Sequence, residues 1–145
     1  RPVAISCAIF ALITASTAAH EVADKSVARR KFDKQGRLGE VTFIDYGVTP
    51  PLTERLSIVH EPTESRVRTT ERGKQLLRQE TERYAEPGVL SEREILFSST
   101  GDGKLDRRTV MTYTGHFVKG VEFELVNGKW KQKSEQEYST LESSS

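Results

Sequence analysis

The chain contains little that would support covalent or metal chemistry. It has a single cysteine, Cys7, so no disulfide can form within one molecule. Its three histidines, His20, His60 and His116, are far apart and lack the spacing of metal ligands. It has neither a Gly-x-Ser-x-Gly nucleophile motif nor a glycine-rich phosphate-binding loop. We therefore expect no enzyme activity, no bound metal and no cofactor.

A long hydrophobic run is also missing. The longest apolar stretch, residues 3–15, is too short for a membrane span, which takes about 20 residues. It leads into the small residues 16–19, a pattern typical of a secretory signal peptide. We predict a signal peptide over residues 1–19, cleaved after Ala18 or Ala19, and a secreted or periplasmic mature protein without a membrane span. The alternative is a short buried N-terminal helix.

The predicted mature chain has no net charge. Of the 22 basic residues only Arg1 lies in the signal peptide, which leaves 21 basic and 21 acidic residues in 20–145. Proteins that bind nucleic acid normally present a basic face, so we expect no nucleic-acid partner. Apolar residues are also scarce, so the core must be thin. A sheet with one packed face and one solvent-exposed face suits this composition better than a helical bundle.

One pattern occurs four times in the chain: a turn glycine, a basic residue, a large apolar residue, and a tyrosine eight positions after the apolar residue. An even spacing of eight places both residues on one face of a strand, whereas on a helix they would lie about 80° apart. The turns before each copy, above all Asn127-Gly128, favour hairpins. The copies are Gly36-Arg37-Leu38 with Tyr46, Gly73-Lys74-Gln75-Leu76 with Tyr84, Gly103-Lys104-Leu105 with Tyr113, and Gly128-Lys129-Trp130 with Tyr138.

The repeat predicts an all-β domain over residues 20–138, followed by a polar tail at 139–145. We expect an antiparallel meander of about eight strands built from four β-hairpins, forming a single twisted sheet or an open barrel. The first hairpin covers about 28–46, and a strand over 52–60 follows it and ends at Glu61-Pro62. The later strands are predicted near 91–99, 104–113, 117–126 and 129–138.

Residues 73–85 support two interpretations. Their composition, rich in Leu, Gln, Glu and Arg, is typical of a helix that ends before Pro87-Gly88. The repeat instead predicts a strand there. We favour the strand, because the step of eight residues from the apolar residue to the tyrosine matches the other copies.

The first copy resembles a known repeat family. Lys31-Phe32-Asp33-Lys34-Gln35-Gly36-Arg37-Leu38, followed by Phe43, Asp45 and Tyr46, is similar to the YD repeat of RHS-type bacterial proteins, best over residues 31–47. That repeat consists of an aromatic-Asp pair, a short turn, Gly-Arg-Leu and a strand ending in Tyr-Asp. In RHS proteins such repeats are structural and build large shells. The resemblance implies hairpin repeats in an exported bacterial protein.

The tyrosines are the candidate binding residues. If the four arms align, Tyr46, Tyr84, Tyr113 and Tyr138 form a row near one end of the sheet, and Trp130 shares the parity of Tyr138. Such an aromatic row would stack on sugar rings or on an apolar patch of a partner protein. The alternative is that these large side chains pack the core.

Two functions follow from these features. The first is a non-enzymatic binding or scaffold protein of the bacterial envelope, with a protein or carbohydrate partner. The second is a secreted effector that acts on a host. Gln75-Leu76-Leu77-Arg78, with Glu92-Arg93-Glu94 downstream, looks like a degenerate form of the RxLR translocation motif of oomycete effectors, although its first arginine is absent.

Overall fold

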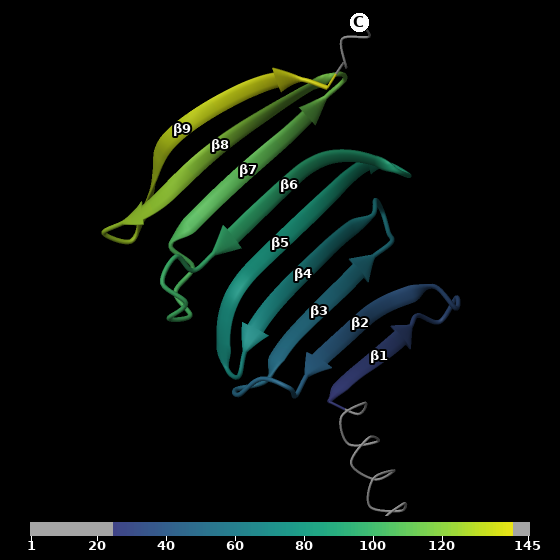
Figure 1. The fold of residues 1–145 in the computed structure, drawn as a ribbon. Coiled ribbons are helices and arrows are strands. Elements are labelled where there is room, and N and C mark those ends of the chain that lie inside the picture. Colours follow the sequence, from purple (N-terminus) through teal and green to yellow (C-terminus); the bar gives the residue numbers. More distant parts are fainter. Residues whose placement is uncertain (1–24, 141–145) are drawn as a thin grey trace, which may run out of the picture.

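A computed structural model describes residues 25–140, and within this range every regular element is a β-strand. The nine strands form one antiparallel sheet, and each strand pairs with the next along the chain (Figure 1). The sheet is not closed, so β1 and β9 are its edges. The strands are β1 (Ser26–Phe32), β2 (Leu38–Asp45), β3 (Leu52–Val59), β4 (Ser65–Arg72), β5 (Gln75–Glu86), β6 (Val89–Phe97), β7 (Arg107–Thr114), β8 (Phe117–Val126) and β9 (Lys129–Ser139).

The predicted antiparallel meander is confirmed, but it has nine strands rather than about eight. The additional member is β3, which was predicted over 52–60 but belongs to none of the four hairpins. It changes the geometry of the whole repeat, because every added strand reverses the direction of the chain. As a result β2 runs antiparallel to β5, β7 and β9, although all four are outgoing arms of the repeat (Figure 1).

The predicted signal peptide and residues 141–145 of the predicted tail lie outside the described residues. Within residues 25–140 the structure contains no helix that could cross a membrane.

The segment that could have been a helix is strand β5, as the repeat predicts. Helix propensity differs between residues by only about 0.7 kcal/mol at most, apart from Gly and Pro. As a strand, this segment forms hydrogen-bond ladders with both β4 and β6. Its Glu80 and Glu82 lie opposite Arg68 and Arg66 of β4, and opposite-charge pairs across strands stabilise a sheet by roughly 0.2–1 kcal/mol each. The neighbouring strands therefore outweigh the local preference.

Register shifts alter the faces that the repeat predicts. In three copies one residue is skipped between the apolar residue and the tyrosine: Gly39 in β2, Leu77 in β5 and Lys133 in β9. One extra residue on one strand of a pair reverses the alternation of side chains beyond it. The prediction that the apolar residue and the tyrosine share a face is therefore wrong in these copies.

The connection between β6 and β7 is longer than the turn signal predicts, because β6 ends at Phe97 and β7 begins at Arg107. Two aspartates order this loop. Asp106 accepts a hydrogen bond from the Ser99 amide at 2.8 Å, and Asp102 accepts one from the Lys104 amide at 2.9 Å. These backbone contacts satisfy amides that a ladder would otherwise have paired.

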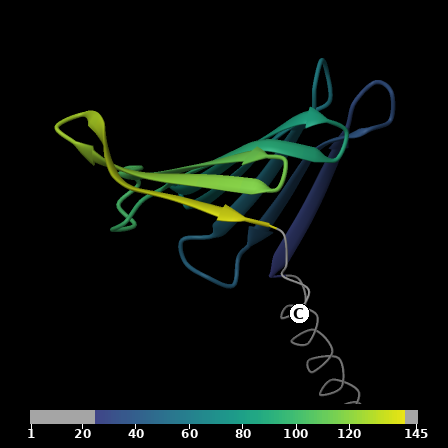
Figure 2. The same ribbon diagram turned by 90° about the horizontal axis from the view of Figure 1, so that it is seen from above.

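The sheet is a single layer within the described residues, which corrects the expectation of one packed face (Figure 2). Val118, with 2% of its surface exposed, is the one buried apolar residue in residues 25–140. Long charged side chains lie across the strands instead. Arg93 pairs with Glu82 at 3.0 Å and Arg108 pairs with Glu94 at 2.6 Å. The Arg108 guanidinium also lies 5.1 Å from the centre of the Phe123 ring, so charged side chains join neighbouring strands across the sheet.

Candidate functional site

Three of the predicted tyrosines lie on one face and at one end of the sheet. Tyr84, Tyr113 and Tyr138 stand near the ends of β5, β7 and β9, which all run in the same direction. The register pairs Tyr113 with Val118 and Val118 with Tyr138, so these three side chains share a face. We call this surface the tyrosine face.

Tyr84 belongs to the tyrosine face through Glu82. The register pairs Glu82 with Arg93 and Arg93 with Met111, two residues before Tyr113 on β7. The Tyr84 hydroxyl donates a hydrogen bond to a Glu82 carboxylate oxygen at 2.7 Å. The aromatic row therefore spans β5 to β9 on alternate strands.

Tyr46 lies outside this row. It follows the end of β2, which runs against the other three outgoing arms, so Tyr46 lies at the opposite end of the sheet. Its amide donates to the Lys25 carbonyl at 2.6 Å, and its surface is 51% exposed. The prediction of a four-tyrosine row is wrong at this position, because the added strand β3 reverses the chain direction.

Trp130 is also separated from Tyr138. It pairs with Leu125, whereas Tyr138 pairs with Val118, and the skipped Lys133 lies between the two aromatic residues on β9. The skip places Trp130 on the face opposite the tyrosine face, with 37% of its surface exposed. The prediction that Trp130 shares a face with Tyr138 is therefore wrong, because a bulge leaves no clear mark on the spacing of residues.

The tyrosines divide between the two roles considered for them. Tyr113 is partly buried, and its hydroxyl lies 3.8 Å from the sulfur of Met111. Tyr138 is 49% exposed at the edge strand. The two lie opposite Val118 on the strands at either side of it. Tyr113 therefore packs against the sheet, while about half of the surface of Tyr138 is exposed to solvent.

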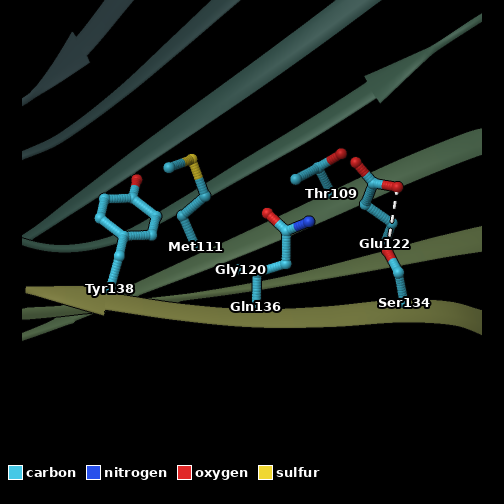
Figure 3. A pocket seen from close by; sticks show the side chains of 7 residues that line it. All are labelled: Thr109, Met111, Gly120, Glu122, Ser134, Gln136 and Tyr138. Carbon is cyan, nitrogen blue, oxygen red and sulfur yellow. Dashed lines mark hydrogen bonds between the residues drawn. The ribbon is translucent and has the colours of Figure 1, made fainter.

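A shallow groove of about 180 Å³ opens beside Tyr138 on the tyrosine face (Figure 3). Its floor is Gly120 on β8, which has Met111 of β7 on one side and Gln136 of β9 on the other. A Cβ atom at Gly120 would meet no atom within 4 Å, so the hollow lies directly above this residue. We call it the Gly120 groove; it is lined by Thr109, Met111, Gly120, Glu122, Ser134, Gln136 and Tyr138.

The polar groups of the Gly120 groove are only partly used by the protein. The Ser134 hydroxyl donates to a Glu122 carboxylate oxygen at 3.0 Å (Figure 3). The Gln136 amide and the Thr109 hydroxyl have no hydrogen-bond partner among residues 25–140. The groove thus combines an aromatic ring and a thioether with unused donors and acceptors, and sequence reasoning had identified only Tyr138 within it.

An ion-pair network surrounds Tyr84, which lies at the other end of the tyrosine row. The Arg66 guanidinium lies 5.3 Å from the centre of the Tyr84 ring and pairs with Glu64 at 2.6 Å. The hydrogen bond to Glu82 raises the pKa of the Tyr84 hydroxyl above its ordinary value. Burial alone would raise the pKa of Glu82, but hydrogen bonds from Tyr84 and Arg93 outweigh it, and this pKa is lowered. The network fixes Tyr84 in place.

Residues 25–140 contain no group of three His, Cys, Asp or Glu side chains that could hold a metal ion. Glu80 and Glu82 of the tyrosine face pair with Arg93, and Glu122 accepts a hydrogen bond from the Ser134 hydroxyl.

A scan against models of known protein families finds no match, and neither the search of curated proteins nor that of solved structures finds one. The resemblance of residues 31–47 to a YD repeat therefore stays a prediction.

Proposed function

We propose that the protein is an exported, non-enzymatic binding protein of the bacterial envelope that holds a carbohydrate on the tyrosine face. The observation that carries this proposal is the exposed ring of Tyr138 beside a groove with unused polar groups, on a sheet that no second layer covers within residues 25–140. Domains normally bury such a sheet face against another layer. A face left open, with aromatic and neutral polar groups side by side, is suited to a ligand that is itself partly apolar and rich in hydroxyls.

Export to the envelope rests on the pattern of residues 1–19. It is tested by expressing the full chain in a bacterium with a functional secretion pathway and measuring the mass of the mature protein. We expect an N-terminus at Ala19 or His20. A soluble product that retains Cys7 would contradict export by this route.

Carbohydrate binding is tested with the full chain on an array of neutral oligosaccharides and bacterial polysaccharides. We compare Tyr138→Ala with Tyr46→Ala, since Tyr46 is equally exposed but lies at the opposite end of the sheet. An aromatic contact of roughly 0.5–1.5 kcal/mol, together with lost area, predicts about a tenfold loss of affinity for Tyr138→Ala. We expect no change for Tyr46→Ala.

Two results would count against this function. Absence of binding to every neutral glycan would remove the proposed ligand class. An equal loss in both variants would show that binding does not involve the tyrosine face.

The effector function gains no support from the fold. Residues 75–78, which resemble the translocation motif, are part of β5 and pair with β4. Their backbone is held in the sheet, whereas a translocation signal of this kind is expected in a disordered leader.

A further inference from the structure

Gly120 is unusual among the glycines of this protein. Seven of the ten adopt a positive φ in turns, where a side chain would be strained. Of the other three, Gly39 and Gly47 have atoms within 4 Å of the place that a Cβ would take, at 3.7 Å and 3.0 Å. Gly120 alone has neither a positive φ nor any atom near that place.

The fold therefore gives no backbone reason for a glycine at position 120. A glycine inside a strand destabilises the sheet relative to alanine, and strands favour β-branched residues still more. Nothing in the described part of the chain offsets this cost through close packing above Gly120. A strand-interior glycine often marks a bulge, a bend, or a place where a ligand or another backbone approaches closely, and the open space above Gly120 leaves room for a ligand.

The groups around Gly120 define what could enter. Tyr138 and Met111 lie together on one side of the groove and form an apolar wall (Figure 3). The Gln136 amide stands beside the floor, and Glu122 with its Ser134 partner lies farther along (Figure 3). The one charged group in the lining is the Glu122 carboxylate, which accepts from hydroxyl donors and repels anions.

We propose that the Gly120 groove is a subsite for a single neutral pyranose ring. The apolar face of the ring packs on Tyr138 and Met111 in the space that a side chain at position 120 would fill. Its hydroxyls donate to Glu122 and exchange hydrogen bonds with Gln136. The volume of about 180 Å³ is below the roughly 300–1,000 Å³ of pockets for larger ligands, which limits the subsite to one ring.

This inference rests on the proposed carbohydrate-binding function and adds the subsite and the role of Gly120. Its test is to fill the groove without disturbing the fold. Gly120→Ala and Gly120→Val should be at least as stable as the wild type, because a Cβ atom at this position meets open space and a side chain reduces the freedom of the unfolded chain. Both should weaken binding, slightly for alanine and at least about tenfold for valine.

The control variant is Val121→Ile, which enlarges the next side chain on the same strand. Val121 pairs with Val110 and Glu135, on the face opposite the Gly120 groove. Thermal melting and titrations with methyl glycosides of glucose, galactose, mannose and N-acetylglucosamine, followed by nuclear magnetic resonance, would be made on the full chain of each variant. We expect Val121→Ile to bind as the wild type does, and galacturonic acid to bind more weakly than galactose.

The outcomes separate the subsite from the function. If oligosaccharide binding depends on Tyr138 but Gly120→Val binds as tightly as the wild type, the subsite is wrong and the function stands. If the wild type binds no glycan, both the subsite and the proposed function are wrong. If instead a lysine-rich peptide binds and Gly120→Val abolishes that binding, the groove takes a cationic side chain, and the pyranose assignment is overturned.

Discussion

Replacing Val118 by alanine tests whether Val118 and the tyrosines on either side of it act as the core of the sheet. The sheet has no second layer within the described residues. Val118 is 2% exposed and lies between Tyr113 and Tyr138. Val118→Ala removes two carbons, each worth about 0.8 kcal/mol when buried. The flanking rings lie on an open face and can move toward the gap, so the additional cavity cost is small. We expect the free energy of unfolding to fall by about 2 kcal/mol.

The matched control is Val59→Ala in β3. Val59 is 55% exposed, so this change removes the same atoms from a strand without removing them from a buried site. Its cost comes from β-propensity, whose whole range is about 1 kcal/mol. The difference between the two variants therefore isolates the contribution of burial.

The assay is urea unfolding followed by circular dichroism, with the midpoint and the slope compared between variants. An unchanged slope would show that only stability has changed. Equal midpoints for Val118→Ala and Val59→Ala would refute the reasoning. The tyrosines would then not shield Val118 in solution.

Three further predictions concern other parts of the sheet. Tyr113→Ala should lower the free energy of unfolding by about 2 kcal/mol, less than the roughly 3–5 kcal/mol of a fully buried aromatic residue, because Tyr113 is only partly buried; urea melts measure it. Because the folded pKa of Glu82 lies below its ordinary value of 4.5, its contribution to stability is present above that pH and is lost as the pH falls through the lower folded pKa. Glu82→Gln should therefore flatten the acid side of a stability profile measured between pH 3 and pH 7, and an unchanged profile would contradict the assigned network. Far-ultraviolet circular dichroism of residues 20–145 should show almost no helix, whereas a signal equivalent to a dozen helical residues would contradict the strand assignment of β5.

The sequence by itself determined where the chain turns and which segments are strands. The glycines at 36, 73, 103 and 128 all adopt a positive φ, and Asn127 does so beside Gly128. These are local preferences of the backbone, so they can be read from one short stretch at a time. The strand at β5 was predicted from the repeated pattern, against the helical preference of its own residues, and its ladders with β4 and β6 stabilise it.

Which face each side chain occupies depended on the partner strands. Trp130 and Tyr138 are eight residues apart, yet they lie on opposite faces because Lys133 is skipped in the pairing of β9 with β8. A bulge is set by how two strands fit together, and a slip of one residue reverses every side chain beyond it. The spacing of residues along one strand does not reveal such a bulge.

The end of the sheet at which each tyrosine lies was decided by the number of strands between the repeats. Tyr46 is separated from the row by β3, which carries no copy of the pattern and reverses the direction of everything after it. The groove was also beyond the reach of the sequence, because Met111, Gly120 and Gln136 come from three strands and meet only through their register. The sequence therefore determined the hairpins, because turns depend on local backbone preference. The pairing of whole strands determined the tyrosine face, because a face depends on contacts between residues far apart in the chain.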